Sequence, residues 1–333
     1  MTRISVGDAS LTNILARQGA ELRATVSRTS QEVTTGRHTD LPKALRGDVS
    51  PLLAIDASLT RLQAFRTTAK DAALHTAAQQ VALGALSDLA KGITTTLLGA
   101  PEFQTQAQVN AIASDMRGRL ESAVGLLNTQ AAGRAIFSGT SADRIPLGTA
   151  DDLLAALETA ATGATTAGTV AAAVEGWFAD PLGYAAFYQG GGALSGVPIA
   201  AGETAEIPTT AMDPAIRDTL KGLALAALLD RGMLAGNGEE RALLAERAGQ
   251  VLLTSEDARI TLSARIGSVE AQIEAARTRN GAEETALGIL RSDIGAVDPY
   301  EAATRLEAAE AQLESLYLVT ARVSRLSLVE FLR

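Results

Sequence analysis

Side chains capable of acid–base or metal chemistry are few in this chain and lie far apart in the sequence. It has two histidines, His38 and His75, and no cysteine in 333 residues. Neither histidine has a carboxylate or second ligand at a spacing that repeats a known site, and such a site needs several convergent groups. The missing cysteine excludes disulfides and thiolate chemistry. We expect no metal site, no cofactor and a structural or surface role for both histidines.

Hydrolytic and phosphate chemistry also lack a convincing motif. A glycan hydrolase would need two carboxylates, and Asp151/Asp152 or Glu203/Glu206 are formally available for that role. We interpret them instead as solvated acids on an exposed segment. The triplet 190–192 is not followed by the Lys-Ser/Thr of a phosphate loop, and Gly-x-Ser-x-Gly does not occur. The sequence therefore predicts that the protein is not an enzyme.

The charge is unevenly distributed. Residues 145–216 hold eight acids and no Lys or Arg, so this segment carries −8 of the net −9. Nucleic-acid binding needs a basic face, which this balance argues against. We expect residues 145–216 to form a separate, outward-facing unit. No apolar run approaches the ~18 residues of a membrane span, and Asp8 stands where a signal peptide would have its apolar core, so we expect neither membrane insertion nor a cleaved signal.

The apolar periodicity near both ends of the sequence predicts long helices. Near the end, apolar or small residues recur at alternating spacings of four and three, which is a heptad seam. They are Ala302, Leu306, Ala309, Leu313, Leu316, Thr320 and Val323. A helix predicted for residues 10–34 carries a second apolar face and stops at Gly36, a residue that accepts the left-handed conformation past a helix end. These two helices are expected to pair.

Between the ends, the periodicity predicts helices over about 51–98, 104–135, 214–234 and 239–294. The segment 151–175 shows one weak helix at 151–161. Five of the eleven aromatic residues fall within residues 177–188 and should anchor a small core. Residues 197–200 and 204–207 suggest a short β-hairpin. The expected fold is mainly α: an elongated rod of long antiparallel helices, with a terminal coiled coil, a helical bundle and a small α+β insert.

An apolar helix at each end of the chain suggests a role in subunit packing. A pair of helices leaves much of its apolar surface open, so neighbouring subunits are expected to cover the rest. An intramolecular bundle is the simpler alternative. The residues predicted to pack between subunits are Leu11, Leu15, Leu22, Val26, Leu306, Leu313, Leu316, Val323, Leu326 and Phe331.

At these residues the chain resembles the flagellin superfamily and, within it, the hook-associated junction proteins. Four strings carry the likeness: Gln31-Glu-Val-Thr-Thr-Gly-Arg37, Ala132-Gly-Arg-Ala-Ile-Phe137-Ser-Gly-Thr140, Asp213-Pro-Ala-Ile-Arg-Asp-Thr-Leu, and Asp298-Pro-Tyr-Glu-Ala-Ala to Leu326-Ser-Leu-Val-Glu-Phe-Leu. After Arg37 the chain reads His38-Thr-Asp-Leu in place of the Asn-Ser-Ala-Asp-Asp-like stretch of flagellins. That departure favours a junction protein over a main filament subunit.

The resemblance implies three regions. Residues 1–35 and 298–333 would form the terminal coiled-coil helices, and 36–140 with 213–297 the helical bundle body. Residues 141–212 would project outward as the acidic insert. The implied place is the extracellular flagellum, reached by export through the flagellum's own channel.

The implied function is a non-catalytic structural subunit that joins hook to filament. Its implied partners are a neighbouring hook-associated protein, flagellin, copies of itself in a ring, and an export chaperone at the C-terminal helix. A minor flagellin of the filament is the alternative within this class. A cytosolic coiled-coil binding module is the alternative from a different class.

Overall fold

The computed structural model describes the backbone of residues 6–102 and 105–331, and within these the side chains of residues 13–102, 105–323 and 325. The described chain is mainly helical with two short hairpins, which confirms the predicted fold class of long antiparallel helices with a small β component. It divides into two compact units. The terminal unit comprises residues 1–61 and 282–333, and the central unit comprises residues 62–281.

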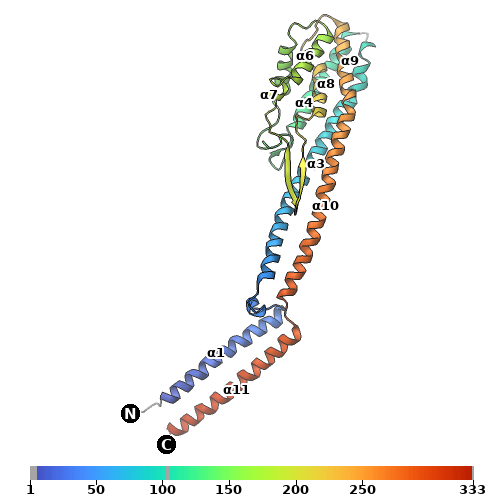
Figure 1. Cartoon of the computed structure of the whole chain (residues 1–333). Helices are drawn as coiled ribbons and strands as arrows, with labels where there is room; N and C mark the ends of the chain where they lie inside the picture. The colour runs from blue at the N-terminus through green and yellow to red at the C-terminus, as the bar shows by residue number, and fades with distance from the viewer. Residues whose placement is uncertain (1–5, 103–104, 332–333) are drawn as a thin grey trace. The chain divides into compact units, whose positions relative to one another are not determined.

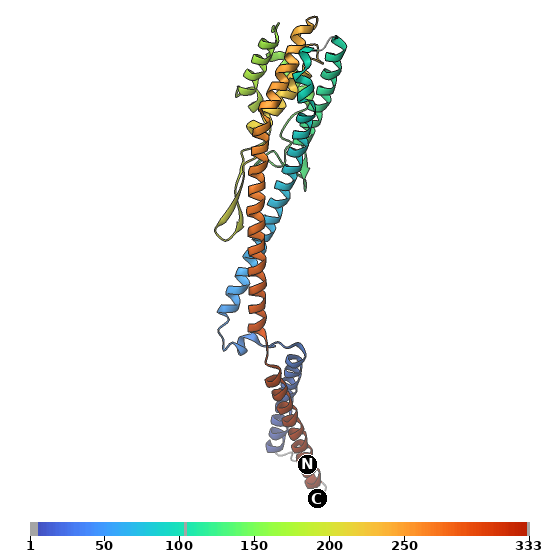
Figure 2. The same cartoon turned by 90° about the vertical axis from the view of Figure 1, so that its right-hand side faces the viewer.

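The terminal unit is built on two long helices, α1 (Val6–Thr35) and α11 (Pro299–Phe331), which lie side by side in Figures 1 and 2. Helix α1 stops before Gly36, whose φ of 67° is the left-handed conformation expected there. Helix α11 starts at Pro299, and the Asp298 carboxylate accepts the Tyr300 N–H at 2.8 Å. The short α2 (Leu41–Ala44) and the near ends of α3 and α10 complete this unit.

The central unit packs the main parts of α3 (Ser50–Leu98) and α10 (Glu256–Gly295) against α4 (Gln106–Leu127), α8 (Pro214–Ala227) and α9 (Gly238–Thr254). A 3-10 turn, η1 (Ala100–Glu102), ends the α3 side. Gln80 meets Ser263, and Lys91 meets Glu256, so α3 and α10 run antiparallel. Asp213 caps α8 by accepting the Ala215 N–H at 3.0 Å.

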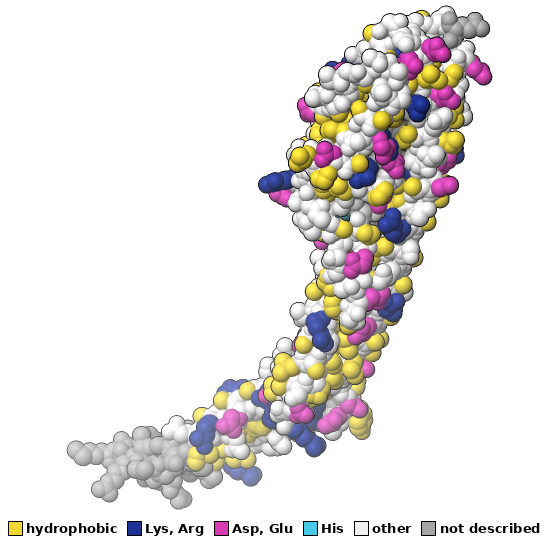
Figure 3. All heavy atoms as spheres, turned by 45° about the horizontal axis from the view of Figure 1, so that its top comes forward, with side chains coloured by type: hydrophobic (Ala, Val, Ile, Leu, Met, Phe, Trp, Pro, Cys, Tyr) yellow, Lys and Arg dark blue, Asp and Glu magenta, His cyan; other side chains and the backbone are white. Residues whose placement is uncertain are grey.

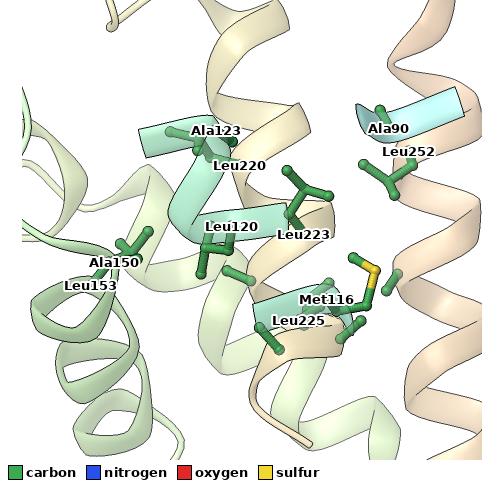
Figure 4. Close-up of a cluster of buried hydrophobic side chains, with 14 of the residues drawn as sticks. Ala90, Met116, Leu120, Ala123, Ala150, Leu153, Leu220, Leu223, Leu225 and Leu252 are labelled. Atoms are coloured by element: carbon green, nitrogen blue, oxygen red, sulfur yellow. The ribbon is translucent and has the colours of Figure 1, made fainter. Parts of the chain in front are cut away.

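The core of the central unit is rich in leucine and alanine. Met116 and Leu120 of α4 lie among Leu220 and Leu223 of α8, with Leu252 of α9 nearby (Figure 4). All five side chains are buried. One described helix, α3, is long and apolar enough to pass a membrane-span test by length and composition. Its buried residues line this core instead.

Two predicted helices end earlier than expected. The one predicted over 214–234 stops at Ala227. The one predicted to reach residue 135 stops at Leu127, because a tight hairpin follows, β1 (Gln130–Ala131) and β2 (Arg134–Ala135). The turn residues Ala132 and Gly133 both have positive φ, as such two-residue turns require.

The tract predicted as one helix over 239–294 is interrupted at Ser255. The Ser255 hydroxyl and the Arg259 guanidinium both donate to the Leu252 carbonyl, at 3.0 and 3.3 Å. Side-chain donors of this kind compete with the helical backbone for its acceptors.

The segment 141–212 contains α5 (Ala150–Ala160), α6 (Ala167–Ala179), α7 (Tyr184–Phe187) and a hairpin of β3 (Leu194–Ala200) and β4 (Glu203–Ile207). The hairpin matches the predicted one. Aromatic rings provide the expected anchor: Phe178 stacks on Tyr184 with centroids 5.1 Å apart, and the buried Tyr184 hydroxyl donates to Ala211 O at 2.7 Å. Helix α6 was not predicted, although Thr166 gives it a complete capping box.

The acids of residues 145–216 have partners that the sequence did not predict. Five of the eight pair with cations of the central unit, and Figure 3 shows charges of both signs lying close together on one face. The pairs are Asp151–Arg117 at 3.1 Å, Glu158–Arg231 at 3.4 Å, Glu175–Lys221 at 2.6 Å, Asp213–Arg265 at 3.4 Å, and Glu203–Arg279. Buried residues of the segment join the same core as α3 and α4. These ion pairs and the shared core join the segment to the rest of the central unit.

Candidate subunit-packing surface

The α1–α11 pair holds the residues that the sequence singles out. Seven of the predicted packing residues have half-buried side chains on the two helices: Leu15, Leu22, Val26, Leu306, Leu313, Leu316 and Val323. The two helices also pack together at Gly19, which is buried. A Cβ placed on Gly19 would lie 3.5 Å from Leu316 Cδ2. The side chains of Leu11, Leu326 and Phe331 lie outside the described residues, so their role stays a prediction.

A polar cluster lies at the end of the α1–α11 pair, near the C-terminus of α1. Glu32 is only 6% exposed. Its Oε1 accepts the Thr39 N–H at 3.0 Å and lies 3.9 Å from His38 Nδ1, while its Oε2 lies 3.9 Å from an Arg305 nitrogen. The backbone adds two bonds, His38 N to Gly295 O and Val297 N to Gly36 O, both 3.0 Å. The segment that follows α1 and the segment that precedes α11 are thus hydrogen-bonded to each other.

Three residues that sequence reasoning missed extend the apolar surface beyond this pair. Tyr317, Leu318 and Val319 are 51%, 67% and 51% exposed. Together with Leu316 they are four consecutive large apolar residues, and successive residues of a helix point about 100° apart. No single partner helix can cover all four. This run of apolar residues could have indicated the wider apolar surface from the sequence. A search for one heptad seam selects only Leu316 from it.

The residues considered for catalysis have structural partners. Asp152 accepts the Thr149 hydroxyl at 2.6 Å, a bond that lowers the pKa of the Asp152 carboxyl, and Glu206 accepts the Gly196 N–H at 3.0 Å. His38 belongs to the Glu32 cluster. His75 is half-buried, and burial, with Arg134 nearby, lowers its pKa. Within the described parts of the chain, no three His, Asp or Glu side chains gather closely enough to hold a metal ion.

Comparisons with known proteins point to one superfamily. Residues 258–332 match the family described as the bacterial flagellin C-terminal helical region. Among solved structures, the crystal structure of Bacillus cereus FlgL is similar at 17% identity, with a TM-score of 0.49, over 72% of this chain and 99% of that chain. A putative flagellar hook-associated protein from Vibrio parahaemolyticus is similar at 13% identity, with a TM-score of 0.48, over 73% and 95%. No curated protein sequence matches.

The family match covers α11 and most of α10, the helices that carry the seam and the exposed run at 317–319. Residues 258–332 match the bacterial flagellin C-terminal helical region, in agreement with the resemblance to the flagellin superfamily seen in the sequence.

Proposed function

We propose that this protein is a non-catalytic structural subunit of the bacterial flagellum that joins hook to filament. One observation carries the proposal. A helix similar to the flagellin C-terminal region is apolar around its circumference at residues 316–319, and among the described residues α1 is the helix that packs along it. Such a helix needs further neighbours, and a flagellin-type subunit gains them by assembly.

The energetics favour assembly as the step that stabilises the terminal unit. The seven described packing residues are half-buried, and Tyr317, Leu318 and Val319 are more exposed still. Fully burying a large apolar side chain contributes about 1.5–3 kcal/mol. Completing the burial of several such residues is comparable to the whole stability of many domains. We therefore expect the terminal helices to be marginally stable alone and firmly ordered between subunits.

The proposed partners are copies of the same chain in a ring, a neighbouring hook-associated protein, flagellin, and an export chaperone at the C-terminal helix. The terminal pair 1–35 and 298–333 would pack innermost, and 141–212 would face outward. Export without a cleaved signal peptide is part of this proposal. N-terminal sequencing of the flagellum-bound protein tests it, since loss of a leader would contradict it.

Deletion of the gene, followed by electron microscopy, is the main test. Cells without the protein should build hooks and release flagellin into the medium, and normal filaments would contradict the proposal. Labelling the protein along purified flagella locates it at the same time. One ring at the hook end supports the junction role, whereas label along the filament would indicate a minor flagellin. Retention inside the cell would indicate a binding module unrelated to the flagellum.

A truncation separates assembly from folding. A chain ending at Asp298 lacks α11 but keeps the whole central unit. It should give a folded central core by circular dichroism and protease protection, and fail to join flagella. A truncated chain that still assembles would remove the role assigned to α11.

A further inference from the structure

A cavity of about 440 Å³ lies within the terminal unit, between α1, α2 and α11. Three cationic side chains line it: Arg28 of α1, Lys43 of α2 and Arg305 of α11. Among the described residues, Arg305 has one ion pair, at 3.9 Å to the buried Glu32, while Arg28 and Lys43 have none. Asp40 also lines the cavity, but it caps α2 by accepting the Lys43 N–H at 3.2 Å. The cavity therefore offers cations without a full set of counter-charges.

Helix α11 also carries a row of acidic residues, the acidic stripe, on another part of its surface. Glu307, Glu310 and Glu314 are exposed, and none has an ion pair or hydrogen bond within the described part of the chain. At about 100° per residue, these three lie roughly 140–200° around α11 from Arg305. The stripe is thus on the flank of α11 turned away from the cavity. By the same periodicity, Arg23 of α1 lies on the side of the helix pair that carries the stripe. Its Nε donates a hydrogen bond to Gly19 O at 3.1 Å.

We propose that the cavity receives the acidic stripe of a second copy of this chain, with Glu310 and Glu314 entering beside Arg28 and Lys43. The inference rests on the proposed function, because it names the contact between neighbouring subunits. In this arrangement the cationic flank of one subunit meets the acidic flank of the next, so the two surfaces in contact differ and the contact is heterologous. Heterologous contacts propagate into rings or helical tubes, whereas two-fold contacts stop at a dimer.

The charges set the direction and register of this contact more than its strength. Exposed ion pairs contribute little individually, but like charges brought together at an interface are strongly disfavoured. Apolar burial at 316–319 supplies most of the affinity, and it is not directional. The cavity and stripe therefore determine which flank of one subunit faces which flank of the next.

Charge reversal in the full chain tests the contact. A cavity variant carries Arg28→Glu and Lys43→Glu, and a stripe variant carries Glu310→Lys and Glu314→Lys. Each alone brings like charges together, so incorporation into flagella should fall by about tenfold or more. A chain with all four changes restores complementarity and should recover. Co-expression of the two variants should recover as well when they alternate, because the reversed cavity of one meets the reversed stripe of the other and the unchanged cavity meets the unchanged stripe. Lys70→Glu, an exposed change on α3, is the matched control.

Cross-linking gives a readout that does not depend on the stability of those variants. The chain has no cysteine, so Lys43→Cys with Glu310→Cys introduces the only two thiols. A short bismaleimide on isolated flagella should give a ladder of multimers. Dimers alone would overturn the head-to-tail arrangement, and unlinked chains within flagella would overturn the contact. If wild-type protein is absent from flagella, the proposed function fails. The concentrated purified chain then decides the contact by the same ladder.

Discussion

Gly19 of α1 lies directly beneath Leu316 of α11, with a Cβ position on the glycine 3.5 Å from Leu316 Cδ2. That distance is an ordinary van der Waals contact, so one methyl group fits there. Gly19→Ala should stabilise the terminal pair by about 1 kcal/mol through helix propensity. Gly19→Leu should force Leu316 aside and separate the helices.

Limited proteolysis of the terminal unit measures both changes, and incorporation into flagella gives the functional result. Gly19→Ala is the matched control for the larger residue. Equal protection of the Ala and Leu variants would show that α1 and α11 do not meet closely at this point.

The exposed run on α11 should matter for assembly but not for folding. Leu318 is 67% exposed, so Leu318→Lys should leave the melting temperature of the soluble chain within about 1 °C, since exposed substitutions change stability by at most a few tenths of a kcal/mol. In an assembled subunit the new ammonium would be buried in an apolar contact, which is unfavourable. We expect incorporation into flagella to be lost.

Leu318→Met conserves volume and apolar character, and it should assemble like the parent chain. Electron microscopy of cells expressing each variant compares them directly. Assembly of the lysine variant at parental levels would place residue 318 on a surface that stays in solvent.

The β3–β4 hairpin depends on one buried amide from α10. Asn280 Nδ2 donates to Ile199 O at 2.7 Å, and the Asn280 residue is 6% exposed. Asn280→Ala leaves that buried carbonyl without a partner, which costs about 1–3 kcal/mol. Protease cleavage within residues 194–207 should rise, and urea denaturation gives the loss in stability.

Gln272→Ala is the matched control, because Gln272 makes a more exposed bond to Thr204 O at 3.2 Å on the same hairpin. Its effect should be well under that of Asn280→Ala. A hairpin equally resistant in both variants would mean that the apolar contacts of Ile199 and Ile207 hold it without the amide.

The parts of this fold that sequence predicts are those with local causes. The seam of α11 follows from spacing alone, and the stop of α1 from Gly36. The break between α9 and α10 was missed, because the Arg259 side chain that donates to Leu252 O also donates to Thr219, which is distant in sequence, at 3.2 Å. The pairing of acids such as Asp151 was missed for the same reason, since Arg117 lies on another helix. Charge counted along a segment does not reveal the cations that folding brings beside it.

Only part of the candidate subunit-packing surface could be predicted from the sequence, for a related reason. Heptad analysis looks for one face, and it located Leu306, Leu313 and Leu316 on the face toward α1. The cavity with Arg28 and Lys43 forms only when α2 folds against α1 and α11, so no spacing rule finds it. Residues 317–319 were visible in the sequence as an apolar run, but their meaning depends on knowing that the chain leaves them uncovered.

His75 makes the stability of the central unit depend on pH. Burial lowers its pKa, and the nearby Arg134 lowers it further, so the folded chain binds this proton more weakly than the unfolded chain does. The unfolded chain binds the proton at about pH 6.5, and protonation therefore favours unfolding. The stability contribution is fully present above about pH 6.5 and is lost as the pH falls from there through the folded-state pKa. Urea midpoints between about pH 7 and pH 5 should fall in the parent chain and fall less in His75→Gln, which has no titrating group at this position. Parallel curves for the two chains would assign the pH dependence to other groups.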